Sequence, residues 1–172
     1  MKVLKSSFIV VILLVLVSYV ILVNYDNKDI IVFESCIDGD TAWFKINGEK
    51  EKVRLLGIDT PESTNIKEQF GEEASNYTCN MLKNTKNIYI EYDINSDKRD
   101  KYERLLGWIF VDDNNLSELL IKEGLAEVNY IYGDYKYIDD LCHSQYLAYR
   151  KRLRIWSTYD YERNYCYKKN KS

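Results

Sequence analysis

The 172-residue sequence contains one histidine, one proline and seven glycines, and these small numbers exclude several kinds of chemistry. A single histidine, His143, leaves histidine-based zinc sites and Ser-His-Asp arrangements without their parts, and we expect it at the surface. The glycines form no glycine-rich phosphate loop. The four cysteines show neither a C-x-x-C spacing nor a Cys/His spacing typical of zinc. Histidine-based nucleases, zinc sites and phosphate-loop chemistry are therefore dismissed on inventory.

Charged residues are plentiful, at 30%, and hydrophobic residues at 46% fit a globular chain of one domain. The net charge of −3 implies no general affinity for polyanions. The C-terminal part is different, because residues 145–172 contain eight Lys or Arg against two acids. Such a basic end can bind a polyanion or a membrane surface, although solvated charge is the commoner explanation.

The N-terminal residues 8–23 form an almost entirely aliphatic run of sixteen, preceded by Lys2 and Lys5 and followed by polar residues. This pattern predicts an export signal, which the positive-inside rule orients with everything after Asn24 outside the cytoplasm. An uncleaved membrane anchor, a cleaved signal peptide and a buried core helix all remain open. The run is shorter than the roughly 20 residues of a spanning helix, yet no A-x-A-like cleavage site follows it.

An exported chain meets an oxidising compartment in many organisms, so the four cysteines are candidates for disulfides. Cys36, Cys79, Cys142 and Cys166 permit three pairings. Buried or unpaired thiols are the alternative, and the sequence does not decide between them.

From residue 30 onward the chain predicts a β-rich domain, with the strongest hairpin signal at Asn47-Gly48. The predicted strands are 30–36, 41–46, 52–58, 86–92 and 105–111, and the predicted helices are 72–82, 117–124 with Ser117 as its cap, and 137–153. This order predicts an α+β fold, a five-stranded OB-type β-barrel with about three packed helices. We divide the chain into an export segment or anchor at 1–26, a barrel domain at 27–160 and a basic tail at 161–172.

Two acidic turns are the most informative local feature. The predicted strand that carries Arg54 ends abruptly at Asp59 and Glu62, with the only proline, Pro61, between them. The turn Asp38-Gly39-Asp40 lies about twenty residues earlier, between two other strands. Solvated turn acids are the alternative explanation for each turn alone. If the two turns meet at one end of the sheet, they form a site for a hard cation.

Five motifs in this sequence have the order and spacing found in the staphylococcal nuclease, or thermonuclease, family. They are I-D-G-D-T at 37–41, R-L-L-G-I-D-T-P-E at 54–62, G-E-E-A-S at 71–75, D-K-Y-E-R at 100–104 and Y-I-Y at 130–132. The stretch from about residue 30 to residue 156 therefore resembles that family. The resemblance implies a calcium-dependent phosphodiesterase that acts on DNA and RNA with little sequence specificity. It also implies cleavage of the bond from phosphorus to the 5′ oxygen, which leaves 3′-phosphates.

The resemblance also implies roles for individual residues. Asp40 and Asp59, with the backbone carbonyl of Thr60, would bind Ca²⁺. Asp38 would lie near the metal without binding it directly. Calcium suits such a set, since it accepts several oxygen ligands with loose geometry and leaves places for water and phosphate. The metal site of the family thus corresponds to the two acidic turns.

The reacting phosphate would be served by three further side chains. Glu62 would be the general base that aligns or deprotonates a water, while Arg54 and Arg104 would hold the phosphate and stabilise its charge. The residues that would bind the terminal phosphate and stack on a base are Lys101, Tyr102, Tyr130 and Tyr132.

Some positions depart from the family or have another explanation. The family usually has glycine immediately before the second arginine, and here that position is Glu103. The loop 63–70 is shorter than in staphylococcal nuclease. Arg54 could only form an ion pair at a barrel mouth, and Tyr130 and Tyr132 could only pack. The competing hypothesis is a non-catalytic OB-fold module that binds single strands or an envelope partner. No protein partner is implied, so a monomer is expected, attached to a membrane through residues 8–23 if these are uncleaved.

Overall fold

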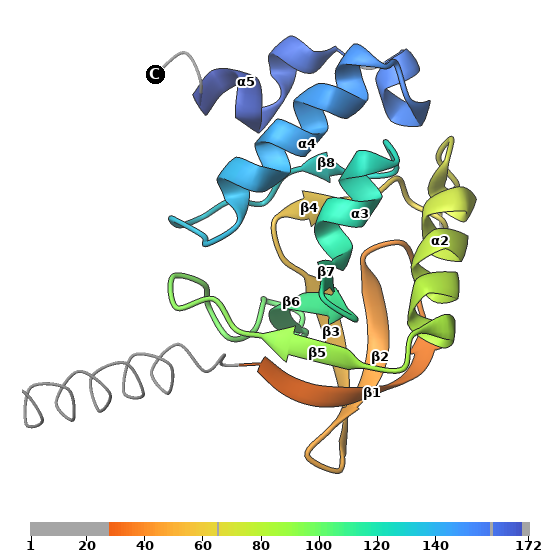
Figure 1. Ribbon diagram of the computed structural model, residues 1–172, viewed down its shortest axis with the longest axis vertical. Helices are drawn as coiled ribbons and strands as arrows, with labels where there is room; N and C mark the ends of the chain where they lie inside the picture. The colour runs from red at the N-terminus through yellow and green to blue at the C-terminus, as the bar shows by residue number, and fades with distance from the viewer. Residues whose placement is uncertain (1–27, 65, 159, 170–172) are drawn as a thin grey trace, which may run out of the picture.

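The computed structural model describes residues 28–64, 66–158 and 160–169 (Figure 1). The predicted export segment or anchor therefore lies outside the described residues. Within these ranges no helix is both long and apolar enough to cross a membrane.

The centre of the fold is a closed barrel of five strands. They are β1 (Lys28–Cys36), β2 (Thr41–Ile46), β3 (Glu49–Leu55), β5 (Ile88–Glu91) and β6 (Leu105–Val111). Neighbouring strands run antiparallel in the order β3-β2-β1-β5-β6, and β3 closes the barrel by pairing in parallel with β6. This closure confirms the predicted OB-type barrel, since it removes the exposed strand edges.

The third strand was predicted wrongly at both ends. The two-residue Asn47-Gly48 turn has φ of 51° and 89°, so β3 begins at once with Glu49 and not at residue 52. At Gly57, φ is 76° and a side chain would come within 2.8 Å of the Trp108 ring. The chain bends there and leaves the barrel. It continues as β4 (Ile58–Asp59), which pairs with β8 (Glu127–Val128).

The three predicted helices are present, with shifted bounds. They are α2 (Gly71–Asn84), α3 (Leu116–Lys122) and α4 (Ile138–Arg150). The N-cap of α3 is Asn115, in the short strand β7 (Asn114–Asn115), and its side chain accepts a hydrogen bond from the Ser117 N–H. The prediction of Ser117 as cap was therefore wrong: its buried hydroxyl donates to the Leu56 carbonyl instead, at 3.0 Å. The helix α4 lies beyond α3 and β8, on the side away from the barrel (Figure 1).

The C-terminal residues fold against α4. They form the 3₁₀ turns η1 (Arg154–Ser157) and η2 (Tyr161–Arg163) and the short helix α5 (Tyr165–Lys169). Aromatic rings hold this region together, for example Tyr149 and Tyr161, which stack with centroids 4.5 Å apart. Part of the segment predicted as a basic tail is thus packed, and Cys166 in α5 is fully buried.

All four cysteines form disulfides, which settles the alternatives left open above. Cys36 at the end of β1 is bonded to Cys79 of α2, with Cα atoms 5.8 Å apart. Cys142 of α4 is bonded to Cys166, with Cα atoms 5.4 Å apart. The first bond ties the strand that precedes the acidic turn 38–40 to α2. The second ties the C-terminal segment to α4.

The main core fills the barrel and continues between the barrel and the helices. Its largest fully buried side chains include Phe44 and Leu55 from the hairpin, Trp108 from β6 and Leu120 from α3. The indole N–H of Trp108 donates to the buried carboxylate of Asp93 at 2.9 Å. A single apolar core therefore fixes β3, β6 and the chain that leaves them, which are the elements that carry the candidate site.

Candidate active site

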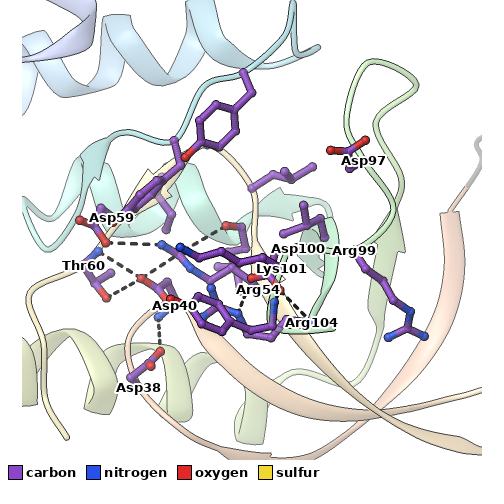
Figure 2. Close-up of a pocket in the computed structure, with 18 of the residues that line it drawn as sticks. Asp38, Asp40, Arg54, Asp59, Thr60, Asp97, Arg99, Asp100, Lys101 and Arg104 are labelled. Carbon is purple, nitrogen blue, oxygen red and sulfur yellow. Dashed lines mark hydrogen bonds and ion pairs between the residues drawn. The ribbon is translucent and has the colours of Figure 1, made fainter. Parts of the chain in front are cut away.

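One cavity of about 550 Å³ lies where β3 ends, bordered by the loop 97–104 and the segment 130–135 (Figure 2). All eleven residues predicted for the site line it: Asp38, Asp40, Arg54, Asp59, Thr60, Glu62, Lys101, Tyr102, Arg104, Tyr130 and Tyr132. They come from segments far apart in the chain. The fold therefore brings together the two acidic turns, the two arginines and the tyrosines.

The acidic turn 38–40 is held rigidly from several sides. Asp40 donates its N–H to Asp38 Oδ1 at 3.1 Å, which closes the turn. The Gly39 carbonyl accepts a hydrogen bond of 2.6 Å from the hydroxyl of Thr78 in α2. A side chain at Gly39 would come within 2.7 Å of Thr60 Oγ1, so only glycine lets the two acidic turns approach this closely. Asp40, a residue only 6% exposed, is thereby fixed at the cavity.

Asp40 is the centre of a network that joins the two turns (Figure 2). Its Oδ2 accepts hydrogen bonds from Thr60, at 3.1 Å from the hydroxyl and 3.3 Å from the backbone N–H. Arg54 lies beside it, with Nη1 3.1 Å from Asp40 Oδ2 and Nη2 3.4 Å from Asp59 Oδ1. The guanidinium thus neutralises part of the charge that the two carboxylates create.

Burial, together with the charges of neighbouring carboxylates, changes the acidity of the carboxyls in this network. Burial and the charge of Asp40 raise the pKa of Asp38 to about 6. Burial also raises the pKa of Asp59 to about 6, with Arg54 acting in the opposite direction and nearby carboxylates adding to the rise. Carboxyls whose ionised form is disfavoured in this way gain stability from a bound cation. The electrostatics therefore suit a divalent ion.

The donor set can be tested against the metal that the family implies. Among the described ranges no three His, Cys, Asp or Glu side chains come together as a metal-binding group. What the turns offer is two carboxylates, Asp40 and Asp59, and the backbone of Thr60. Oxygen donors of this kind fit a hard cation such as Ca²⁺, which completes its coordination with water or phosphate oxygens. The residues fit calcium, provided that solvent or substrate supplies the other ligands.

Glu62 lines the cavity at the start of the next loop. Its Oε1 accepts three hydrogen bonds, from the N–H groups of Ser63 and Thr64 and from the Thr64 hydroxyl at 2.6 Å. The bonds from Thr64, the hydroxyl first, lower the pKa of Glu62 and keep it ionised at neutral pH. Within the part of the chain that the structure describes, Oε2 accepts no hydrogen bond. This oxygen can therefore accept one from water.

Arg104 is held by a partner that the sequence analysis did not single out. Asp100 Oδ2 accepts a hydrogen bond of 2.6 Å from Arg104 Nε, and Asp100 Oδ1 accepts one of 3.0 Å from the Arg104 backbone N–H. Arg104 Nη1 also reaches Thr41 Oγ1, at 3.4 Å. The spacing of four between Asp100 and Arg104 was the only sequence signal for this pair. Asp100 is thus a positioning residue for the second arginine.

The backbone of this loop explains the family's glycine. Glu103 has φ of 60°, a left-handed conformation that glycine adopts without strain. Its carbonyl accepts a hydrogen bond of 2.9 Å from Arg99. The Arg99 guanidinium points away from Asp40 and Asp59 (Figure 2) and forms an ion pair with Glu51. The glutamate therefore keeps the expected turn, and its exposed side chain adds a negative charge beside Arg104.

Three tyrosines present their rings at the rim of the cavity. Tyr102, Tyr130 and Tyr132 are 67%, 49% and 83% exposed, which excludes core packing as their reason. The Arg104 guanidinium lies 5.5 Å from the Tyr102 ring centroid, and that of Arg54 lies 5.5 Å from the Tyr130 ring. The negative charge of Asp59 raises the pKa of Tyr130, so its phenol stays protonated. Exposed rings beside guanidinium groups suit stacking on a base next to a phosphate.

Comparison with known proteins agrees with this geometry. Residues 52–158 match the family model described as staphylococcal nuclease homologue. The chain is 38% identical over 138 residues to Endonuclease YncB of Bacillus subtilis, covering 78% of this chain and 64% of that protein. It is 37% identical over 123 residues to the Thermonuclease of Staphylococcus intermedius, covering 70% of this chain and 71% of that protein. The chain belongs to the staphylococcal nuclease family.

The match to longer relatives is partial. The chain spans less than two thirds of YncB and 45% of the SPbeta prophage-derived endonuclease YokF of Bacillus subtilis, to which it is 38% identical over 135 residues. The predicted family is confirmed, while the activity of the whole protein is a matter for proposal.

Proposed function

We propose that this protein is a calcium-dependent nuclease that hydrolyses phosphodiester bonds of DNA and RNA with little sequence specificity and leaves 3′-phosphates. The observation that carries the proposal is the meeting of both acidic turns, both arginines and Glu62 in one cavity. The printed names of the relatives, endonuclease and thermonuclease, support the reaction class. The exposed tyrosines support weak sequence specificity, because every base offers a face for stacking.

The chain's own residues would act as follows. Glu62 Oε2 accepts a hydrogen bond from a water and orients it, so that the water oxygen bonds to phosphorus as its proton passes to the Glu62 carboxylate. The bond from phosphorus to the 5′ oxygen breaks, and that oxygen takes up a proton from solvent. Arg54 and Arg104 donate to the phosphate oxygens, on which negative charge increases in the transition state. Their fixed positions supply this stabilisation without reorganisation during the reaction.

Asp40, Asp59 and the Thr60 carbonyl are the groups that would hold calcium. When bound, the ion supplies charge for the phosphate oxygens and lowers the cost of bringing an anionic substrate among carboxylates. The contact from Arg54 to both carboxylates would then weaken, which frees guanidinium donors for the phosphate.

We further propose that the protein works outside the cytoplasm, either secreted or anchored by residues 8–23. The two disulfides support an oxidising compartment, and the aliphatic run after Lys2 and Lys5 supports export. Fractionation of cells tests this: the protein should be found in the membrane or outside the cell. Reduced, full-length protein in the cytoplasm would refute it.

The activity is tested with the full chain on single-stranded DNA and RNA, first with calcium and then with a chelator. Activity should require calcium. Glu62→Gln, at calcium saturation, should keep nucleotide affinity and lose at least about a hundredfold in turnover, the usual effect of removing a general base. Asp40→Ala should instead raise the calcium concentration needed. A wild-type protein that binds strands but never cleaves them would favour a binding module.

A further inference from the structure

The hairpin of β2 and β3 projects from the barrel on the side away from α4 (Figure 1), and Arg54 near the end of β3 lines the cavity. The register places Thr41 opposite Arg54, then Trp43 opposite Lys52, then Lys45 opposite Lys50. The alternate residues, such as Phe44 opposite Glu51 and Ala42 opposite Val53, belong to the other face, and the apolar ones lie in the core. Three successive pairs on the outer face therefore run from the cavity toward the hairpin tip.

The second and third pairs form a basic surface around one aromatic ring. We call Trp43, Lys45, Lys50 and Lys52 the hairpin strip. The ammonium groups of Lys50 and Lys52 lie 5.0 Å and 5.1 Å from the Trp43 ring centroid. Trp43 is half-buried and Lys45 is exposed. Lys50 also pairs with Glu34 at 3.2 Å, whereas Lys45 and Lys52 make no ion pair within the described ranges.

Packing alone does not account for this composition. A tryptophan on a solvent-facing strand pair gains contacts from the lysine stems, but apolar or neutral side chains would supply such contacts as well. Lys52 beside the ring and Lys45 in the next pair of the row have no acidic partner within the described ranges, so the strip carries net positive charge. A ring with flanking ammonium groups is suited to a chain of alternating bases and phosphates.

Resting on the proposed function, we propose that the hairpin strip binds the part of a single strand that continues out of the cavity. A base would stack on Trp43, and Lys45 and Lys52 would contact the phosphates on either side. The strip is continuous with the cavity, because Arg54 and Thr41, which contacts Arg104, form the first pair of the same row. The strip would then extend the binding site by several nucleotides and favour long substrates over short ones.

A membrane surface is the rival occupant. Ile30 and Val32 on β1 are 75% and 61% exposed, and Val32 lies opposite Lys45. Anionic lipid would seat on these apolar side chains as well as on the lysines. The continuity of the strip with the arginines of the cavity favours the strand.

The experiment compares cleavage of a dinucleotide with cleavage of a single strand of roughly twelve nucleotides, within the site sizes of OB folds. The test variants are Trp43→Leu and the double variant Lys45→Gln/Lys52→Gln. The matched control is Lys83→Gln/Lys151→Gln, which removes two exposed lysines from α2 and the end of α4. Trp43→Phe tests whether an aromatic ring is enough. Thermal melting shows that each variant is folded.

For the long strand, Trp43→Leu should raise KM about tenfold with kcat unchanged, and Trp43→Phe should restore most of the loss. The lysine double variant should lower the slope of log KM against log salt by about 1.4, from about 0.7 per phosphate contact. The dinucleotide should be cleaved normally by all variants, and the control should behave as wild type.

Equal effects on both substrates, or no effect on either, would overturn the proposal while cleavage of the dinucleotide keeps the proposed function intact. Loss of binding to phosphatidylserine vesicles in the strip variants, with normal KM on the long strand, would overturn it in favour of the membrane. If the wild type cleaves neither substrate, the proposed function fails. The strip is then judged from fluorescence anisotropy with a labelled oligothymidylate, where unchanged affinity in the variants would refute it.

Discussion

The two arginines of the cavity are held by different means. Arg54 is in the barrel strand β3 with 9% of its side chain exposed, and its partners Asp40 and Asp59 come from both acidic turns. Arg104 has 25% of its side chain exposed, and its closest partner, Asp100, belongs to the same loop. Arg54 is therefore positioned by the core of the fold, and Arg104 mainly by local hydrogen bonds. Tolerance to substitution should differ accordingly.

The largest expected effect comes from replacing each arginine by lysine. Lysine keeps the charge but lacks the planar fork that lets Arg54 reach two carboxylates and that would let it donate to the phosphate in the proposed reaction. Arg54→Lys should lower kcat by about two to three orders of magnitude, as for loss of one fixed donor. Arg104→Lys, at the more exposed site, should lower it about tenfold. Turnover at saturating calcium and substrate gives both values, and a larger loss at Arg104 would reverse the comparison.

The two disulfides can be compared in the same way as the two arginines, because only one of them lies next to an acidic turn. Cys36 lies two residues before Asp38, so removal of the Cys36–Cys79 bond should both destabilise the protein and weaken calcium binding. Removal of the Cys142–Cys166 bond should only destabilise. With sequence separations of 43 and 24, each loss is expected to cost about 3–4 kcal/mol of unfolding free energy.

Paired Cys→Ser variants, examined by denaturant unfolding and by calcium titration, separate these effects. Equal calcium affinity in the two variants would mean that α2 and Thr78 hold the acidic turn without the disulfide.

The two regions should also respond to pH in opposite directions when calcium is chelated. The folded-state pKa of Asp59, about 6, lies above its ordinary 3.8, so the folded state holds the extra proton between about pH 4 and pH 6. Stability contributed by protonated Asp59 is lost as pH rises through that window. Asp59→Asn should therefore raise Tm at pH 7 by a few degrees, and the gain should shrink toward pH 4.

Asp100, in the loop 97–104, is the carboxyl to compare with Asp59. Although burial opposes it, hydrogen bonds from Arg104 and Tyr102 lower the pKa of Asp100 below its ordinary value. Its stabilising effect is thus present above about pH 4 and is lost as pH falls further. Asp100→Asn should lower Tm at pH 7, and the deficit should persist down to about pH 4. Melting curves in chelator at several pH values test both, and the same sign for the two variants would contradict the charge distribution described for the cavity.

The comparison also shows what the sequence could predict. The segment 38–62, which supplies one side of the cavity, was predictable because its signals are local. These are the Asn47-Gly48 turn, two acidic turns and one proline between carboxylates. The break of the strand at Gly57 was not, since it depends on contact with Trp108, far along the chain. Nor did composition predict η2 and α5, where lysines suggest solvent while Tyr161 and Cys166 are buried. Long-range packing decided these features, and local pattern carries little information about it.

The role of Asp100 was missed for a related reason. In the motif at 100–104 it could equally have been a solvated turn acid, and only the loop's closure, with the Glu103 N–H donating to the Asp100 carbonyl at 3.0 Å, brings it to Arg104. Both arginines were found in the sequence, but only the support of Arg54 could be predicted with them.

The smallest expected effect is that of Glu103→Gly, which changes the residue immediately before Arg104. Glu103 has φ of 60°, a conformation that costs a non-glycine residue roughly 1–2 kcal/mol, while glycine adds backbone freedom to the unfolded chain that offsets part of the gain. The exposed carboxylate also brings negative charge toward Arg104, where the proposed function places the phosphate. Because the Glu103 carbonyl and N–H keep their hydrogen bonds in the variant, the loop geometry should be unchanged.

Glu103→Gly should therefore leave stability equal or higher by about 1 kcal/mol and leave turnover equal or a few times higher. Glu103→Gln separates the two causes, since it removes the charge and keeps the strained backbone. If glutamine alone reproduces the gain in turnover, charge is responsible; if only glycine raises Tm, backbone strain is. Arg104→Ala is the reference and should lower turnover strongly. Should Glu103→Gly and Arg104→Ala both leave turnover unchanged, Arg104 is not the second phosphate-binding arginine, and the loop 97–104 serves the fold of the cavity rather than its chemistry.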